Sequence, residues 1–333
     1  MTAKPDSYSN SEFTSSGNAG FTLQINLSAG DTDYAALTVP RLACAHPRAV
    51  RRVAVVDLCR PQTTRIFDSF RRLPEPGFAE RVTQIRTVTQ QLRSDGWIDE
   101  IVWLEPGSPR LAGLARRYLA PGLTETHDYG GCANLAYWAG LDAPVTRFVV
   151  HYDADMCLHQ APGFDWAEVA LALWQRYPDA VMATPRISPP GFAVDTENDA
   201  PSLHEGRPFH RVADGWLNDW FSTRCFLLDR ERLAPHLPLM QGRLGWEYKL
   251  RRLWDRGYPP GPEMLLFRVL GPRGLRRLNL ADERAWLLHP NKKTPAYLEL
   301  LPRLLESVAA GRVPDVQRGQ SEIDVPAWQE FSR

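Results

Sequence analysis

Short apolar runs alternate with stretches of helical periodicity along most of the chain. Strand-like runs, each closed by proline, glycine or aspartate, lie at residues 51–59, 98–108 and 146–155. Apolar residues at helical spacing lie between them, at residues 78–96, 111–119 and 132–141. Strands that alternate with helices over short links form a parallel sheet covered on both faces, so the pattern predicts an α/β fold.

The second half of the chain continues this alternation. It predicts a helix over 164–178, a strand over 180–185, a strand and short helix over 220–237, a helix over 246–258, a strand over 285–290, and a helix over 297–311 broken at Pro302. We therefore expect a main domain over 49–292, with a first half at 49–160 and a second half at 161–292. Residues 293–333 would form a C-terminal helix and tail.

Two segments fall outside this pattern. Residues 1–48 are expected to be a flexible N-terminal arm, in which 21–27 and 33–40 form a hairpin that covers the main domain or reaches a neighbouring subunit in a homodimer. Residues 186–215 are long and polar and contain several prolines. A loop of this length in a compact domain is either a lid over a site or a disordered insertion.

Composition narrows the functional class. The 333 residues carry 39 basic and 39 acidic side chains, and this zero net charge argues against a nucleic-acid partner. No apolar stretch reaches the roughly 18 residues of a membrane span, and the polar N-terminus lacks the apolar core of a signal peptide. The five cysteines are scattered and never form a CxxC pair. These features predict a reduced, cytoplasmic protein without a structural zinc site.

The run FVVHYDADMCLH, residues 148–159, carries the clearest chemical signal. An apolar strand ends in Asp153 and Asp155, and ligands of parallel α/β sheets bind beyond the carboxyl ends of the strands. Residues two apart on an extended segment point the same way, and two adjacent carboxylates are best satisfied by a cation between them. Oxygen ligands suit Mg²⁺ or Mn²⁺, which also bridge phosphates. Without further context, such a pair is more often a solvated turn.

The flanking sequence supplies that context, because residues 50–292 resemble the GT-A fold of nucleotide-sugar-dependent glycosyltransferases, particularly bacterial family 2. The matching pieces are the turn at Glu105-Pro106-Gly107-Ser108, the helix start at Gly131-Cys132-Ala133-Asn134, the motif Asp153-Ala154-Asp155, the segments FSTRCFLLDRERL and EYKLRRLWDRGY, and His289 in LLHP. The resemblance implies a Rossmann-like, mostly parallel central sheet with helices on both faces. It also implies that the half at 49–160 binds the nucleotide and that the half at 161–292 binds the acceptor.

The resemblance also implies roles for particular residues. Asp153, Asp155 and His289 would bind Mn²⁺ or Mg²⁺. The donor, a UDP-, GDP- or dTDP-sugar, would be contacted by Glu105, Asn134, Asp153 and Lys292, with Lys293 also near the diphosphate. Glu247 would be the catalytic base, although it lies one residue later than the family's acidic motif, and a retaining enzyme would not need such a base. Trp216, Trp220 and Trp246 would either stack on the small-molecule or glycan acceptor or pack in the core.

Other functions remain open at this point. A sugar nucleotidyltransferase shares a related sheet, but the Gly-x-Gly-x-Arg loop expected after its first strand is absent, and DLCRPQTTR follows residues 51–56 instead. A phosphatase with an aspartyl nucleophile would need a threonine or valine at position 157, which is a cysteine. A catalytically degenerate protein that binds nucleotides without transferring a sugar is the third alternative. Turnover of a nucleotide sugar would distinguish it from an enzyme.

Overall fold

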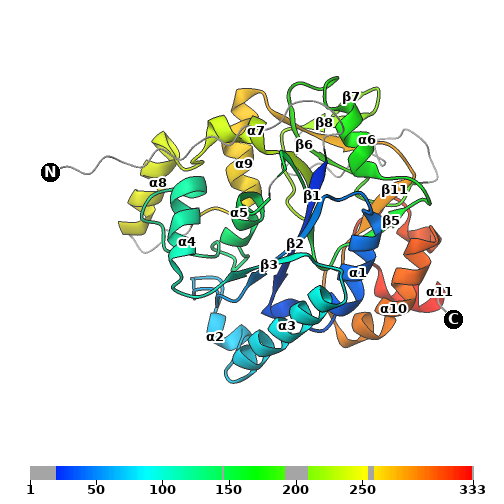
Figure 1. Cartoon of the computed structure of the whole chain (residues 1–333), viewed down its shortest axis with the longest axis horizontal. Helices are drawn as coiled ribbons and strands as arrows, with labels where there is room; N and C mark the ends of the chain where they lie inside the picture. Colours follow the sequence, from blue (N-terminus) through cyan, green and yellow to red (C-terminus); the bar gives the residue numbers. More distant parts are fainter. Residues whose placement is uncertain (1–19, 145, 192–208, 254–258, 332–333) are drawn as a thin grey trace.

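The protein has a central sheet with helices on both faces, seen in a computed structural model that describes residues 20–144, 146–191, 209–253 and 259–331 (Figure 1). Among these residues, nine strands form one sheet in the spatial order β3-β2-β1-β4-β9-β6-β10-β8-β7. Their bounds are β1 Phe21–Ser28, β2 Arg51–Asp57, β3 Glu100–Leu104, β4 Phe148–Asp153, β6 Ala180–Thr184, β7 His210–Val212, β8 Gly215–Asn218, β9 Cys225–Asp229 and β10 Arg276–Leu280.

The strand directions confirm the expected fold class. β1 runs parallel to both of its neighbours, β2 and β4, and β3 runs parallel to β2. β6 and β10 are also parallel, whereas β9 lies antiparallel between β4 and β6. β8 and β7 complete the far edge as antiparallel strands. The result is the α/β, mostly parallel central sheet that was expected for a GT-A fold.

Helices cover both faces because the strands present apolar side chains alternately to each side. Ala54 and Val56 of β2 belong to one core and Val53 and Val55 to the other. Figure 1 shows one group of helices on each side of the central strands. The first core is packed by α1 (Ala35–Ala45), α3 (Gly77–Ser94), α6 (Trp166–Leu173) and α10 (Pro295–Ala309), and the second by α4 (Pro109–Leu114), α5 (Leu135–Asp142), α8 (Gly242–Leu253) and α9 (Pro262–Leu270).

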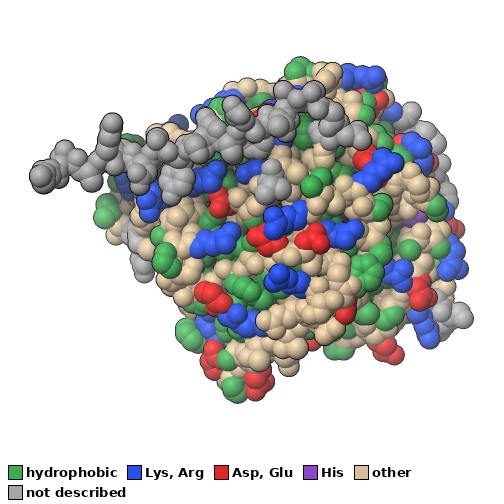
Figure 2. All heavy atoms as spheres, viewed as in Figure 1, with side chains coloured by type: hydrophobic (Ala, Val, Ile, Leu, Met, Phe, Trp, Pro, Cys, Tyr) green, Lys and Arg blue, Asp and Glu red, His purple; other side chains and the backbone are tan. Residues whose placement is uncertain are grey.

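Smaller elements connect these layers. β5 (Cys157–Gln160), the strand that follows β4 in the chain, pairs with β11 (Ala285–Leu288) in a separate two-stranded antiparallel sheet. The short helices are η1 Ala29–Asp31, α2 Ser69–Arg72, η2 Ala115–Leu119, α7 Arg230–Leu233, η4 Ala234–His236, η5 Gly271–Arg273, η6 Asp315–Gln317 and α11 Val325–Phe331. Basic and acidic side chains are interspersed over the face shown in Figure 2, in keeping with the zero net charge.

The predicted N-terminal hairpin is wrong. Residues 21–28 are the central strand β1, and most of 33–40 belongs to α1, so the main domain begins near residue 20. The polar residues of β1 are buried, and they form hydrogen bonds inside the protein. The Thr22 hydroxyl lies 2.8 Å from that of Thr146, and Gln24 donates to Asn26 at 2.6 Å. The described residues therefore contain no hairpin at 21–40 of the kind proposed to reach a neighbouring subunit in a homodimer. Residues 1–19 lie outside the described part of the chain.

The C-terminal segment also differs from its prediction. Pro302 does not break α10, which runs from Pro295 to Ala309. Thr294 is its N-cap residue, and the Thr294 hydroxyl accepts a hydrogen bond from the Tyr297 N–H. Tyr297 and the leucines of α10 pack into the first core, so this segment belongs to the domain rather than to a tail. None of the helices in the described residues combines the length and apolarity needed to cross a bilayer.

Candidate functional site

The carboxyl ends of β1, β2 and β4 bring three acidic residues to one edge of the sheet. In the strand register, Ser28 of β1 pairs with Asp57 of β2, and Asn26 pairs with Asp153 of β4. Asp31 follows β1 in the short helix η1. Ligands of α/β sheets bind at this kind of edge, so the topology places the predicted aspartates where a ligand is expected.

At this edge, the carboxylate of Asp155 lies beside two basic side chains, those of His289 and Lys293. It is 6% exposed, its Oδ2 forms an ion pair with the Lys293 ammonium, and the same oxygen lies 3.4 Å from His289 Nε2. Burial alone would raise the pKa of Asp155, but the contacts with His289 and Lys293 outweigh it and lower the pKa to about 2. Its other oxygen, Oδ1, is buried without a hydrogen-bond partner. This carboxylate is therefore ionised and has one unsatisfied acceptor.

His289 approaches Asp155 in a defined tautomer. Its Nδ1 lies 3.3 Å from a guanidinium nitrogen of Arg224, which can only donate. Nδ1 is therefore the acceptor, and Nε2 carries the proton that faces Asp155. A cation that binds His289 through Nε2 would have to displace this proton.

Asp153 has different surroundings from Asp155. The Tyr137 hydroxyl donates to it, at 2.9 Å from each carboxylate oxygen, and His151 Nε2 lies 3.3 Å from Oδ1. The strand ends at Asp153, and the Met156 N–H donates to the Asp153 carbonyl, so residues 153–156 form a turn rather than the extended segment assumed from the sequence. Within the described residues, no group of three or more His, Cys, Asp or Glu side chains could hold a metal.

Asp31 and Tyr34 join this site, although the sequence analysis did not select them. The Tyr34 hydroxyl donates to Asp31, and the Tyr34 ring lies 6.0 Å from the Lys293 ammonium. Burial raises the pKa of Asp31 to about 6, the negative charge of Asp155 adds to this, and hydrogen bonds from Tyr34 and Ser28 oppose it. These residues were missed because the strand that precedes them was interpreted as an arm. Their signal is an Asp-x-x-Tyr sequence directly after an apolar strand.

A pocket of about 500 Å³ opens beside Asp153 and is called the Asp153 pocket here. Its acidic and basic lining residues are Asp128, Asp153, Arg224, Glu263, Arg277 and His289. Of the three predicted aromatic contacts, Trp220 lines this pocket and Trp246 is 67% exposed on α8. Trp216 is buried on β8 beneath Arg211.

Glu247, the predicted base, is not among the residues that line this pocket. It lies on α8 beside a separate small cavity and pairs with Arg243 at 3.1 Å and Arg268 at 2.7 Å. The hydrogen bond from Arg268 is the main reason that the pKa of Glu247 is lowered. Besides Asp128 and Asp153, the pocket is lined by the carboxylate of Glu263, at the start of α9, whose Oε1 accepts the Thr223 N–H at 2.9 Å.

The other predicted donor contacts have structural partners. Glu105, just after β3, pairs with Arg86 at 2.6 Å. Asn134 is fully buried, donates to the Pro260 carbonyl and accepts from Trp138 Nε1, so it fixes the start of α5. Lys292 is exposed on the segment where its neighbour Lys293 reaches Asp155.

A second cavity on the same edge lies at the ends of β2 and β3. It measures about 480 Å³, and its polar lining includes Arg60, Gln62 and Thr126. Close by in the chain, the buried Asp57 lies 3.5 Å from His127, measured from Oδ2 to Nε2. Burial raises the pKa of Asp57 and lowers that of His127, so both are driven toward their neutral forms.

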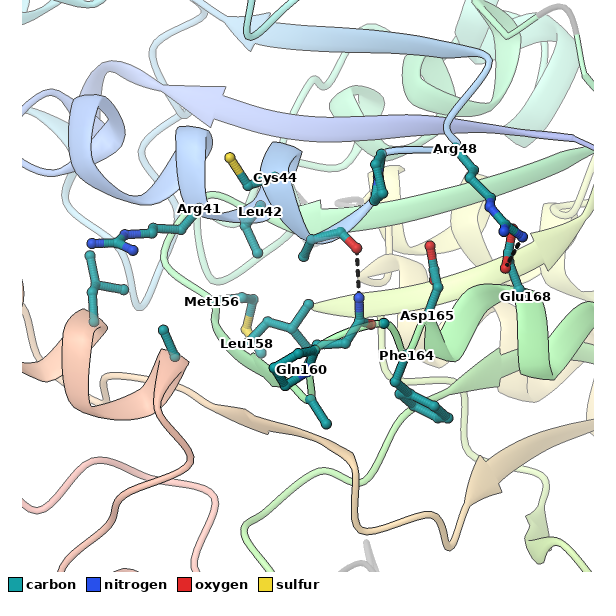
Figure 3. Close-up of a pocket in the computed structure, with 17 residues that line it drawn as sticks. Arg41, Leu42, Cys44, Arg48, Met156, Leu158, Gln160, Phe164, Asp165 and Glu168 are labelled. Carbon is teal, nitrogen blue, oxygen red and sulfur yellow. Dashed lines mark hydrogen bonds and ion pairs between the residues drawn. The ribbon is translucent and has the colours of Figure 1, made fainter.

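A third cavity, of about 440 Å³, lies between α1, β5, α6 and α10 (Figure 3). Several of its polar side chains have partners within the protein: Gln160 donates to the Ala45 carbonyl, and Arg48 pairs with Glu168 at 2.8 Å. Met156 lines both this cavity and the Asp153 pocket. None of the residues predicted to act in function lines it.

The comparisons with known proteins give a weak structural likeness. No protein-family model and no curated protein matches the chain. One similar solved structure is the galactosyltransferase LgtC in complex with donor and acceptor sugar analogues, with 9% sequence identity, a TM-score of 0.36, and coverage of 78% of this chain and 73% of LgtC. Another is the glycosyltransferase GlyE of Streptococcus pneumoniae TIGR4, with 10% identity, a TM-score of 0.34, and coverage of 94% of this chain and 60% of GlyE. At this level of likeness, the function has to follow from the site's own residues.

Proposed function

We propose that the protein is a glycosyltransferase that moves a sugar from a nucleotide-sugar donor to an acceptor with the help of a divalent ion. The observation that carries the proposal is Asp155, a buried carboxylate with an unsatisfied oxygen, held between His289 and Lys293 at the carboxyl edge of the sheet. A diphosphate and its counter-ion are the ligand that such a mixed acidic and basic cluster suits best.

The donor set fits Mg²⁺ or Mn²⁺ in the way these ions bind substrates. Asp155 offers the unsatisfied Oδ1, His289 offers Nε2 once its proton leaves, and Asp153 lines the adjoining pocket. Two protein ligands, Asp155 and His289, would be enough, because these ions commonly take their remaining oxygens from phosphates and water. When bound, the ion would neutralise the charge that develops on the diphosphate leaving group.

The chain's own residues would then bind and orient the two substrates. Lys293 provides a positive charge at the Asp155 carboxylate, where the phosphates would lie. The Asp153 pocket has room for a sugar and an acceptor next to that point. Glu263 lines the pocket and would accept the proton of the attacking acceptor hydroxyl in an inverting reaction. Its backbone partner, the Thr223 N–H, holds the carboxylate in place.

Thermal denaturation with a panel of UDP-, GDP- and dTDP-sugars, each with and without Mn²⁺, tests this proposal. A donor at 100 times its dissociation constant should stabilise the protein by about 2.7 kcal/mol, which appears as a melting shift of several degrees. The donor that binds should then be hydrolysed or transferred. Metal-dependent binding without any turnover would instead support the degenerate nucleotide-binding alternative.

The nucleotidyltransferase alternative has less support once the strand order is known. The first strand of the sheet is β1, and the segment that follows it, Ser28 to Tyr34, contains one glycine and closes into the short helix η1. A loop with Gly-x-Gly-x-Arg is therefore absent after the true first strand as well. The long segment predicted as a lid, 186–215, lies largely outside the described residues.

A further inference from the structure

Arg277 is a buried cation with unsatisfied donors in the wall of the Asp153 pocket. It lies on β10 and is 2% exposed, and its Nε and Nη1 have no hydrogen-bond partner. Among the described residues, no carboxylate forms an ion pair with it. Burial lowers the pKa of Arg277 to about 10, so the guanidinium still carries its charge near neutral pH. A buried charge of this kind is costly unless a partner arrives.

The surrounding strands do not supply that partner. Leu278 and Leu280 of β10 face the first core, so Arg277 and Asn279 face the opposite side of the sheet. Asn218 lies directly across from Arg277 in the β8–β10 register, yet its Oδ1 is buried without a hydrogen bond. The carboxylate of Glu263, from α9, is the strongest charge acting on Arg277 and raises its pKa, without forming an ion pair with it.

Arg277 lies on a different strand from the residues proposed to hold the diphosphate. β10 is separated from β4, which ends at Asp153, by the two strands β9 and β6. At about 4.8 Å per strand, this places the two strands roughly 14 Å apart. The pocket therefore has a metal-side end near Asp153 and His289 and a distal end at Arg277. The distal end is the part left for the acceptor.

We infer that the acceptor carries an anionic group, a carboxylate or a phosphate, that pairs with Arg277 at the distal end of the Asp153 pocket. This rests on the proposed function, because it takes the other end of the pocket for the donor. Charge-assisted hydrogen bonds from a desolvated guanidinium contribute more than those between neutral groups. A neutral sugar would leave the Arg277 charge unpaired, so an acidic acceptor would be selected over its neutral analogue.

Binding of three matched probes to the full-length protein tests the inference. The probes are methyl glucuronide, methyl glucoside and glucose 6-phosphate, titrated up to about 10 mM and followed by ligand-detected NMR. We expect one anionic probe to bind about 10-fold or more tightly than the glucoside. Preference for the glucuronide identifies a carboxylate, and preference for glucose 6-phosphate identifies a phosphate. Equal binding of all three, or binding of none, would overturn the inference.

Two variants separate recognition from folding. Arg277→Met should remove the preference, and its melting temperature should hold or rise because a buried unpaired charge has been replaced by an apolar chain. Arg276→Gln, at the neighbouring position outside the pocket lining, should keep the preference. An anionic preference that persists in Arg277→Met would overturn the inference. Binding of nucleotide with Mn²⁺ should be unchanged in both variants, so failure of the donor proposal would be seen separately.

Discussion

Replacing Asp155 with asparagine should destabilise the folded protein by about 2 kcal/mol near pH 7, even after chelation of all metal. The pKa of Asp155 is about 2 instead of 3.8, because His289 and Lys293 outweigh the effect of burial. A lowered carboxyl pKa means that the folded state favours the ionised form. At about 1.4 kcal/mol for each pKa unit, the difference corresponds to about 2 kcal/mol.

The pH dependence of this loss follows from the sign of the shift. The unfolded chain takes up a proton on this residue near pH 3.8, whereas the folded protein does so only near pH 2. The stabilisation is therefore complete above about pH 4 and is lost as the pH falls through 2. Urea unfolding in EDTA at a series of pH values should show the difference between the wild type and Asp155→Asn shrinking over this interval.

Asp33→Asn is the matched control. Asp33 also pairs with an arginine, Arg81 at 3.0 Å, but both side chains are more than 40% exposed. Exposed pairs contribute at most about 1 kcal/mol, so this variant should change stability little. If Asp155→Asn costs no more than Asp33→Asn, or if its cost is the same at every pH, then the contacts of Asp155 do not stabilise its charge as argued.

Three further predictions concern the base, the metal and the packing of the sheet. Glu263→Gln should reduce turnover by about 10²-fold or more, whereas Glu247→Gln should leave turnover nearly unchanged. Steady-state kinetics showing the reverse order would assign the role of catalytic base to Glu247. His289→Ala should weaken Mn²⁺-dependent nucleotide binding by 10-fold or more in calorimetry but leave metal-free binding unaffected. Gly140→Ala should destabilise the protein by about 1–3 kcal/mol, because the added Cβ would lie 2.5 Å from the Gln24 side chain. Gly113→Ala, with open space around it, should stabilise the protein by about 0.5 kcal/mol. Denaturation experiments that show equal effects for the two variants would contradict the packing of α5 on β1.

The sequence predicts those parts of the fold whose local pattern agrees with their final burial. β2, β3 and β4 each contain a run of apolar residues, which in β2 and β4 is buried on both faces, and periodicity finds them. β1 is also buried, but it carries polar side chains that form hydrogen bonds inside the protein, Thr22 with Thr146 and Gln24 with Asn26. A strand with an internally paired polar face has the same pattern as a half-exposed strand. Only the tertiary structure distinguishes the two.

The site shows the same limit. Asp155 was predicted from its place at the end of an apolar strand and from a sequence resemblance, whereas His289 was predicted from the resemblance alone. The fold brings them to 3.4 Å from each other. Glu263 and Arg277 could not be selected, because a glutamate at a helix start and an arginine in a strand are common on protein surfaces. Their significance comes from the pocket that α9 and β10 form with β4, which no local pattern encodes. The position of Glu247 outside the Asp153 pocket has the same origin, since α8 directs it to two arginines.

Equilibrium binding of nucleotide sugars to the wild type and to Asp155→Asn, each with Mn²⁺ or EDTA, tests the central claim most directly. The proposed function predicts that at least one UDP-, GDP- or dTDP-sugar binds the wild type with Mn²⁺. That binding should weaken by 10-fold or more in EDTA and in Asp155→Asn, while Asp33→Asn behaves as the wild type. If no member of the panel binds, or if binding is the same with EDTA and in Asp155→Asn, the assignment of the metal and diphosphate to this edge of the sheet is contradicted.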